Sequence, residues 1–305
     1  MTSGQTLSTS RPKRSRWARW YVRVPAKWAV LLLVTFFVLF PDPVRFARHV
    51  RHLSDMQAMI QPEAPELSAW AAELQAGIVG ESPRPKQAQA AVQKFVYDKV
   101  AYAWDWDVWG SADYLPTVHE MFARAAASGD GQIREDCDGR AVMAASLMRK
   151  LGYDARIVTD LRHVWVQTPQ GDWMGPGRKK SIVSTARGNR LNARTLASNI
   201  PVSLSYGIAV FPLLRELIIL ATAFVLVLHR RMSWRAAALS ALLLVQGLFF
   251  MRLGVLAPGG VSFDGSSWAA MIGIAHVVGG FAIVLIASAR ARRRSSQRRS
   301  SEAGS

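Results

Sequence analysis

The stretch EDCDGRAVMAASLMRKLGYDARIV (residues 135–158) decides the fold of the central part of this 305-residue chain. Its spacing predicts a helix over Asp138–Leu151, because apolar residues recur on one helical face. The residues of that face are Ala141, Ala144, Met148 and Leu151. Gly152 is placed to end the helix as a C-terminal cap, and residues 153–158 are typical of a strand.

The flanks of this stretch extend the pattern in both directions. Downstream, HVWVQT (residues 163–168) alternates between two faces as a strand does, residues 169–172 form a turn, and Trp173 begins a further strand. Upstream, four segments show helical spacing: residues 44–60, 64–78, 87–100 and 116–127. Helices that precede a small antiparallel sheet predict an α+β domain.

Cys137, the only cysteine of the chain, stands at the start of the predicted helix. The positive end of the helix dipole and the unpaired amides there favour a thiolate, and the same amides can receive an oxyanion. The position therefore suits a nucleophile for acyl chemistry. Glu135, Asp136 and Asp138 oppose thiolate formation unless they point away or are paired. The alternative is a small buried side chain without a chemical role.

His163 follows Cys137 by 26 residues, the distance needed to finish a helix, run one strand and begin the next. Alternation along the strand puts His163, Trp165 and Gln167 on one face. An imidazole at this place can reach the thiol as general base and acid. The alternative is a strand histidine that serves packing alone.

Together these residues resemble the core of transglutaminase-like domains. In that family the nucleophilic cysteine opens a helix ending in Leu-Gly-Tyr or similar, and HVWV (residues 163–166) is similar to the family's His-Ala-Trp-Val strand. DCD (residues 136–138) and the upstream stretch Trp106–Glu120 look most like the bacterial transglutaminase-like cysteine proteinases. The resemblance covers about residues 88–178. It implies a papain-like fold, a Cys-His-Asp set and amide-bond chemistry on a protein or peptide, more often hydrolysis than crosslinking.

The acid of that set has no direct counterpart, because the family's position falls in WMGPGR (residues 173–178). Asp172, just before the tryptophan, and Asp160, three residues before His163, are the candidates. Asp172 needs a bulge in the hairpin, since adjacent strand residues point to opposite faces, and Asp160 must fold back from a turn. A Cys-His pair without an orienting acid is the third possibility, because that acid mainly orients the imidazole.

No cofactor and no metal site is predicted. Asp130, Glu135, Asp136 and Asp138 are acidic residues near the cysteine, but they do not follow EF-hand spacing. A single cysteine excludes an internal disulfide framework and a cysteine zinc cluster. Gln132 is a candidate donor to the oxyanion, with a solvated loop side chain as the alternative.

The net charge of +17 would by itself suggest a nucleic-acid partner. Its distribution excludes that class. Residues 1–27, 229–235 and 289–305 hold sixteen of the 38 Lys and Arg residues and one of the 21 acids, whereas residues 42–205 are nearly neutral with 20 basic and 18 acidic residues. Basic flanks beside apolar segments are typical of a membrane protein.

Four apolar segments predict membrane-spanning helices: residues 26–41, 206–228, 236–256 and 268–289. The first is expected to be an uncleaved anchor, because FPDP (residues 40–43) offers no small-residue cleavage site. The basic flanks place both termini and the loop 229–235 in the cytoplasm and residues 42–205 outside. In a bacterium this topology corresponds to a multi-pass protein of the inner membrane.

Charged groups within these segments are costly and need partners. Glu216, Gln246, Arg252 and His276 fall in the same half of the membrane, so they could join the three C-terminal helices as a polar cluster. The alternative is a Glu-Arg pair that packs at a helix interface or reaches toward the headgroups.

The expected organisation has five parts. They are a basic cytoplasmic tail (1–25), an anchor (26–41), an extracytoplasmic domain (42–205, with the transglutaminase-like core at 88–178), three transmembrane helices (206–289) and a second basic tail (290–305). The first hypothesis is a membrane-anchored cysteine peptidase or amidase. The second is an inactive binding or scaffold protein of the cell envelope. A transporter is the third, and the large domain and absence of repeated spans disfavour it.

Overall fold

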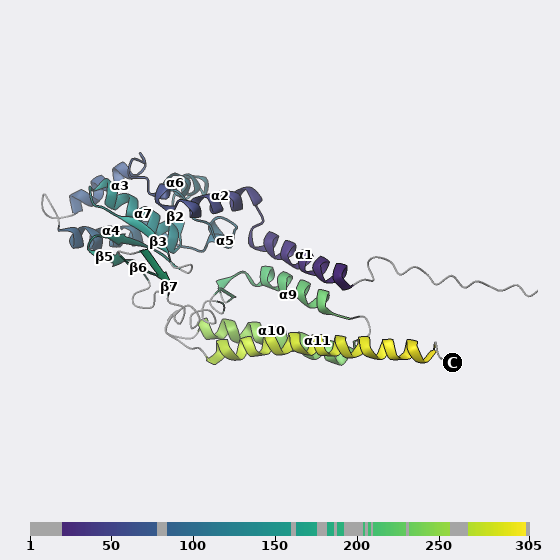
Figure 1. The fold of residues 1–305 in the computed structure, drawn as a ribbon. Helices are drawn as coiled ribbons and strands as arrows, with labels where there is room; N and C mark the ends of the chain where they lie inside the picture. The colour runs from purple at the N-terminus through teal and green to yellow at the C-terminus, as the bar shows by residue number, and fades with distance from the viewer. Residues whose placement is uncertain are drawn as a thin grey trace, which may run out of the picture.

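The structure is a computed structural model. It describes residues 20–77, 84–159, 163–175, 182–185, 188–191, 204, 207–208, 210–229, 232–256 and 268–302. Figure 1 shows a domain of helices and short strands at one end of a group of long helices. Asp160, one candidate for the orienting acid, lies outside the described residues.

The domain runs from helices to strands along the chain. Its helices are α2 (Pro43–Ser54), η2 (Met56–Met59), α3 (Leu67–Gly77), α4 (Pro85–Lys99), α5 (Asp105–Val108), α6 (Val118–Ala127) and α7 (Cys137–Lys150). Its strands are β1 (Val100–Tyr102), β2 (Ile133–Glu135), β3 (Arg156–Thr159), β4 (Val164–Thr168), β5 (Gly171–Trp173), β6 (Ile182–Thr185) and β7 (Gly188–Leu191). This mostly helical arrangement with small sheets is compatible with the predicted α+β class.

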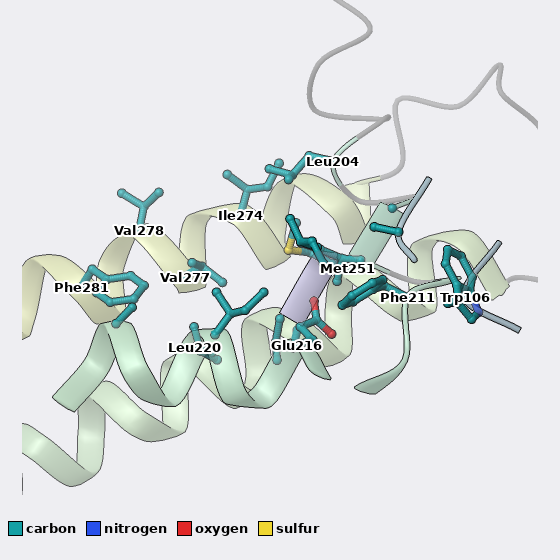
Figure 2. A pocket seen from close by; sticks show the side chains of 17 residues that line it. Trp106, Leu204, Phe211, Glu216, Leu220, Met251, Ile274, Val277, Val278 and Phe281 are labelled. Carbon is teal, nitrogen blue, oxygen red and sulfur yellow. The ribbon is translucent and has the colours of Figure 1, made fainter. Parts of the chain in front are cut away.

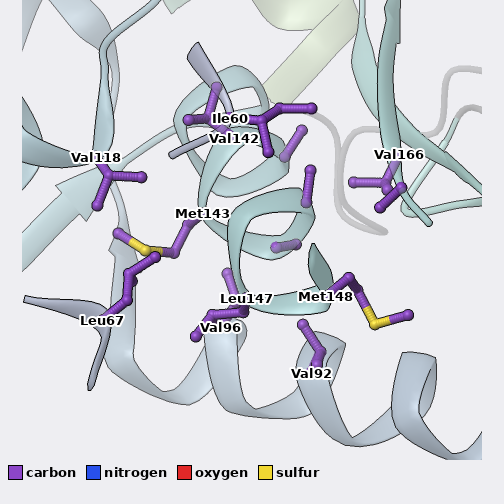
Figure 3. Close-up of a cluster of buried hydrophobic side chains, with 14 of the residues drawn as sticks. Ile60, Leu67, Val92, Val96, Val118, Val142, Met143, Leu147, Met148 and Val166 are labelled. Carbon is purple, nitrogen blue, oxygen red and sulfur yellow. The ribbon is translucent and has the colours of Figure 1, made fainter. Parts of the chain in front are cut away.

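Helix α7 is the centre of the domain. Ten of its fourteen residues are buried, and α4, α6 and β4 pack around it. Figure 3 shows four of its side chains, Val142, Met143, Leu147 and Met148, in this core. Burial of a side chain of this size contributes roughly 1.5–3 kcal/mol, so the core holds α7 firmly. Cys137, its first residue, therefore has a fixed place.

Both ends of α7 follow from local chemistry. Asp136 caps the start, since its carboxylate accepts a hydrogen bond from the Asp138 backbone N–H at 3.2 Å. Gly152 has φ +87°, the left-handed conformation that glycine adopts readily, and ends the helix. The backbone N–H of Tyr153 then donates to the carbonyl of Met148 at 3.0 Å, as in a Schellman motif. The predicted helix and its cap are confirmed.

Three small sheets accompany the helices. Strands β3, β4 and β5 form an antiparallel sheet in which Val166 lies opposite Ile157 on one side and Trp173 on the other. The prediction that Trp173 begins a strand was wrong, because Trp173 ends β5. Strands β1 and β2 form a parallel pair that the sequence did not predict, and β6 pairs with β7.

Three helices among the described residues are long and apolar enough to cross a membrane: α1 (Trp20–Leu39), α10 (Trp234–Leu256) and α11 (Trp268–Glu302). Four were expected, and no such helix is found among the described residues of 206–228. There the structure has α9 (Leu213–Val227), whose 15 residues span only about 22 Å against a hydrocarbon core of about 30 Å.

The long helices nonetheless lie side by side (Figure 1). Helix α9 packs antiparallel to α1, and Lys27 near the start of α1 donates to the carbonyl of Leu226 near the end of α9. Helices α10 and α11 approach closely because glycines face each other. A Cβ at Gly247 would lie 2.8 Å from the carbonyl oxygen of Gly273, so a larger residue there would force the helices apart.

The domain is fastened to the helices at residues 109–112, which we call the joint. The carbonyl of Leu39, at the end of α1, accepts a hydrogen bond from the backbone N–H of Ala112. Arg45 of α2 donates to the first carbonyl of the joint, and Arg215 of α9 donates to the second at 2.9 Å. Three separate elements thus hold one short segment.

Candidate active site

The structure brings the two halves of the predicted site together. Strand β4 packs against α7, and the backbone N–H of Val164, the first residue of β4, lies near enough to the Cys137 sulfur to act against the rise in the pKa of that thiol. His163 immediately precedes Val164, so the imidazole and the thiol come from adjoining positions on two packed elements.

The imidazole of His163 is held by the main chain. Its Nε2 lies 3.0 Å from the carbonyl oxygen of Met174. Because a carbonyl only accepts, Nε2 carries a proton in this contact. The ring also stacks on Trp165, with centroids 6.4 Å apart and planes inclined by 15°. Both contacts fix the orientation of the imidazole.

The carbonyl that holds the imidazole is itself set by an unusual turn. Met174 has φ +59°, the left-handed conformation that non-glycine residues rarely adopt. Gly175 follows with its Cα against Trp165, since a Cβ there would lie 3.0 Å from Cγ of that indole. The turn therefore lies flat on Trp165 and aims the Met174 carbonyl at His163.

Asp172 lies away from the histidine along the sheet. It pairs with Gln167, whose amide donates to its carboxylate at 3.0 Å. Gln167 is four residues along the strand from His163, a separation of about 13 Å at 3.3 Å per residue. This register does not give Asp172 the orienting role considered for it.

Gln132 also has other partners. Its amide nitrogen donates to the carbonyl of Lys99 at 2.7 Å and to that of Ile133 at 3.1 Å. These carbonyls lie at the start of the β1–β2 pair, whereas Cys137 follows its end. The amide is therefore directed at the backbone rather than at a substrate on Cys137.

An acidic cluster adjoins the thiol. Asp105, Glu135, Asp136 and Asp138 each offer a carboxylate oxygen, and these four oxygens lie within 4.8 Å of one another. The parallel pairing of β1 with β2 brings α5, which carries Asp105, to the start of α7. The three acids beside Cys137 were apparent from the sequence. Asp105 was not, because no local sequence pattern indicates that β1 pairs with β2.

Asp105, Glu135 and Asp138 are buried, Asp136 is half-buried, and the carboxylates are only partly hydrogen-bonded. Glu135 accepts from the indole of Trp109 at 3.0 Å, and Asp105 accepts from the backbone N–H of Tyr114 at 2.6 Å. Among the described residues, the second oxygens of both side chains have no hydrogen-bond partner. Burial, and then the charges of neighbouring carboxylates, raise the pKa of Asp105, Glu135 and Asp138 well above ordinary values.

The same surroundings act on the thiol. Burial, followed by the charge of Asp136, raises the pKa of Cys137 above its usual range. The helix dipole was expected to lower that pKa unless the neighbouring acids opposed it. In the structure, burial and the charge of Asp136 outweigh the backbone N–H of Val164, so the pKa of the thiol is raised. The Cys137 side chain is therefore a thiol at neutral pH until its proton is taken.

Glycine at position 139 allows Glu135 to lie against α7. A Cβ on Gly139 would lie 2.6 Å from Cγ and 2.7 Å from Cδ of Glu135, distances that real side chains do not show. A glycine directly after Asp138 is therefore needed for the close packing of Glu135 on α7.

Oxygen-rich clusters of this kind suit a hard divalent cation such as Ca²⁺. Asp105, Glu135, Asp136 and Asp138 are the residues that could hold one. Neutralisation by a cation or by protons would relieve the repulsion within the cluster and lower the pKa of the neighbouring thiol.

No protein-family model, no curated protein and no solved structure matches this chain.

Proposed function

We propose that the chain is a membrane-anchored cysteine hydrolase or acyltransferase that acts on amide bonds of a protein or peptide. The observation that carries the proposal is the packing of β4 against α7, because Cys137 begins α7 and His163 immediately precedes β4. The resemblance to transglutaminase-like domains supports the same chemistry.

The proposed reaction uses two protein groups. Nδ1 of His163 takes the thiol proton of Cys137 while the sulfur bonds to the amide carbonyl carbon. The carbon–nitrogen bond then breaks, and the imidazolium gives its proton to the leaving amine. Water, activated by the same imidazole, hydrolyses the thioester and restores the thiol; a second amine in place of water would give transfer. The first amides of α7 are placed to donate to the oxyanion.

The proposed location is the inner membrane of a bacterium, with the domain outside the cytoplasm. The basic flanks of the apolar helices support it. Fusions of a reporter enzyme that is active only outside the cytoplasm test it. We expect activity after residue 120 and silence after residue 232; activity at 232 or silence at 120 contradicts this topology.

A second candidate is an inactive binding or scaffold protein of the cell envelope. The raised pKa of the Cys137 thiol favours it, because the acid cluster resists formation of the nucleophilic thiolate.

An activated thioester probe separates the two candidates. For an enzyme we expect a covalent acyl intermediate on Cys137 in the wild type, none in Cys137→Ala, and a rate at least about 100-fold lower in His163→Ala. His119→Ala is the matched control, because His119 is exposed and lies on α6. If no probe acylates a Cys137 that small alkylating reagents can reach, the binding function replaces the catalytic one.

A further inference from the structure

A cavity of about 680 Å³ lies between α9 and the pair α10–α11. Figure 2 shows Trp106 and Phe211 at one end of its lining and Phe281 at the other. Its walls are apolar, and Glu216 is the one charged residue among the described residues that line it. Cavities with such walls stay empty of water, so the cavity suits an apolar occupant.

The lining extends along the helix axes. From Glu216 to Ala223 on α9, and from Ile274 to Phe281 on α11, the lining spans eight residues, a rise of about 10 Å at 1.5 Å per residue. The volume falls in the range of about 300–1,000 Å³ typical of small-molecule sites. Apolar walls of this length and volume match one hydrocarbon chain that bends within the cavity.

Glu216 lies between the two ends of the cavity (Figure 2) and is held by an arginine. Nη2 of Arg252 donates to Oε2 of Glu216 at 2.7 Å and to the carbonyl of Phe211 at 2.8 Å. Oε1 of Glu216 is buried and has no hydrogen-bond partner within the described part of the chain. An unpaired buried acceptor is costly, and a hydroxyl or amide N–H of a ligand would satisfy it. The predicted larger polar cluster is reduced here to this Glu-Arg pair.

We infer that the cavity binds one single-chain amphiphile from the surrounding membrane. Its hydrocarbon chain lies along α9 and α11 toward Phe281, and its polar end donates a hydrogen bond to Glu216. This occupant accounts for both properties of the cavity, the apolar length and the lone acceptor. The inference does not depend on catalysis by Cys137.

The polar end of the occupant comes next to the domain. Trp106, which lines the cavity and contacts Phe211 with ring centroids 5.8 Å apart, belongs to the same short helix as Asp105 of the acidic cluster. Ala112, the last residue of the joint, also lines the cavity. The occupant would therefore touch the elements that connect the helices to the candidate active site.

Photolabelling of the full chain in lipid nanodiscs tests the inference. The probe is hexadecanol with a diazirine near the end of its chain, and its methyl ether lacks the hydrogen-bond donor. We expect saturable labelling of α9 and α11 inside the cavity, at a concentration roughly tenfold lower for the alcohol than for the ether. Equal labelling by both probes, or labelling that unlabelled hexadecanol does not compete away, overturns the inference.

Two tryptophan variants localise the binding. Ala223→Trp fills the cavity and should abolish the saturable labelling, whereas Ala221→Trp, two residues away and exposed on α9, should leave it intact. Undiminished labelling in a folded Ala223→Trp protein would count against the cavity. If Ala223→Trp does not fold, the mapped insertion sites in the wild type decide: sites on lining residues support the inference, and sites on exposed positions such as Val225 contradict it.

Discussion

The carbonyl oxygen of Met174 lies 3.0 Å from Nε2 of His163, so a main-chain group holds one nitrogen of the imidazole. This contact depends on Met174, which has a left-handed backbone conformation, and on Gly175, which packs against Trp165. In a catalytic protein, the orientation of the base would thus be encoded in backbone conformation.

Gly175→Ala should lower the rate of acylation of Cys137 by an activated thioester, by about 10- to 100-fold. The new Cβ would lie 3.0–3.1 Å from Cγ and Cδ1 of Trp165, which pushes the turn outward and moves the Met174 carbonyl from His163. Met174→Gly is the control, since glycine keeps the carbonyl and adopts φ +59° without strain. A rate unchanged in Gly175→Ala would show that the carbonyl has no orienting role.

Cys137 should react with iodoacetamide at neutral pH more slowly than a free peptide thiol, because burial and the acid cluster raise its pKa. Asp136→Asn removes a nearby negative charge yet can still cap α7, so it should speed alkylation roughly 3- to 10-fold. Asp98→Asn, an exposed change on α4, should have no effect. Faster alkylation in the wild type than in the peptide would mean that His163 already holds the thiol proton.

The free energy of unfolding should fall as the pH rises from 5 to 8. In the unfolded chain Asp105, Glu135 and Asp138 ionise near pH 4, whereas their raised pKa values let the folded state retain protons at higher pH. Above pH 4 the unfolded state therefore gives up protons that the folded state keeps. Glu135→Gln should flatten this dependence, and the exposed Glu63→Gln should not. Thermal unfolding in detergent at several pH values measures it; a stability that rises toward pH 8 would contradict the raised values.

Calcium should raise the melting temperature at pH 8, when the acid cluster is most strongly self-repelling, and a chelator should reverse the effect. Asp138→Asn removes one of the four converging carboxylates and should reduce the shift. At pH 5 protons compete for the same oxygens, so the shift should be smaller there. An equal response in the variant would assign the calcium effect to another part of the protein.

Gly139→Ala should destabilise the domain by about 1–3 kcal/mol, because its Cβ would overlap the Glu135 side chain. Gly77→Ala, at the end of α3, is the control, since a methyl group added at that position would have no neighbour within 4 Å among the described residues. The double variant Gly139→Ala with Glu135→Ser should recover part of the loss. Chemical unfolding measures all three, and a neutral Gly139→Ala would mean that Glu135 moves aside freely.

The elements nearest the site were predictable because their signals are local. The apolar spacing and glycine cap of α7 appear within twenty residues, and the alternation of β4 appears within six. Parallel pairing of β1 with β2 has no such signal, since each strand has three residues and their partners are 33 positions apart. For that reason Asp105 could not be placed beside Cys137 from the sequence.

The start of α9 at Leu213 was not predicted. Apart from Arg215 and Glu216, residues 206–228 are mostly apolar, but Pro212 lacks a backbone donor and the helix begins directly after it. The pair between Glu216 and Arg252 was among the possibilities that the sequence left open, because long side chains at matching depth can meet only if their helices are neighbours. The position of each charged residue along its helix can be estimated from the sequence, but which helices lie next to each other depends on tertiary packing.

The joint limits how the domain can move relative to the long helices. Hydrogen bonds from the joint to Leu39 at the end of α1 and to Arg215 of α9 oppose a rotation of the domain about its anchor. In the proposed topology they would hold the thiol of Cys137 at one height above the bilayer. For an enzyme of the proposed kind, this fixed height would select the substrate bond by its distance from the lipid surface. Bonds nearer to or farther from the bilayer would not be cut.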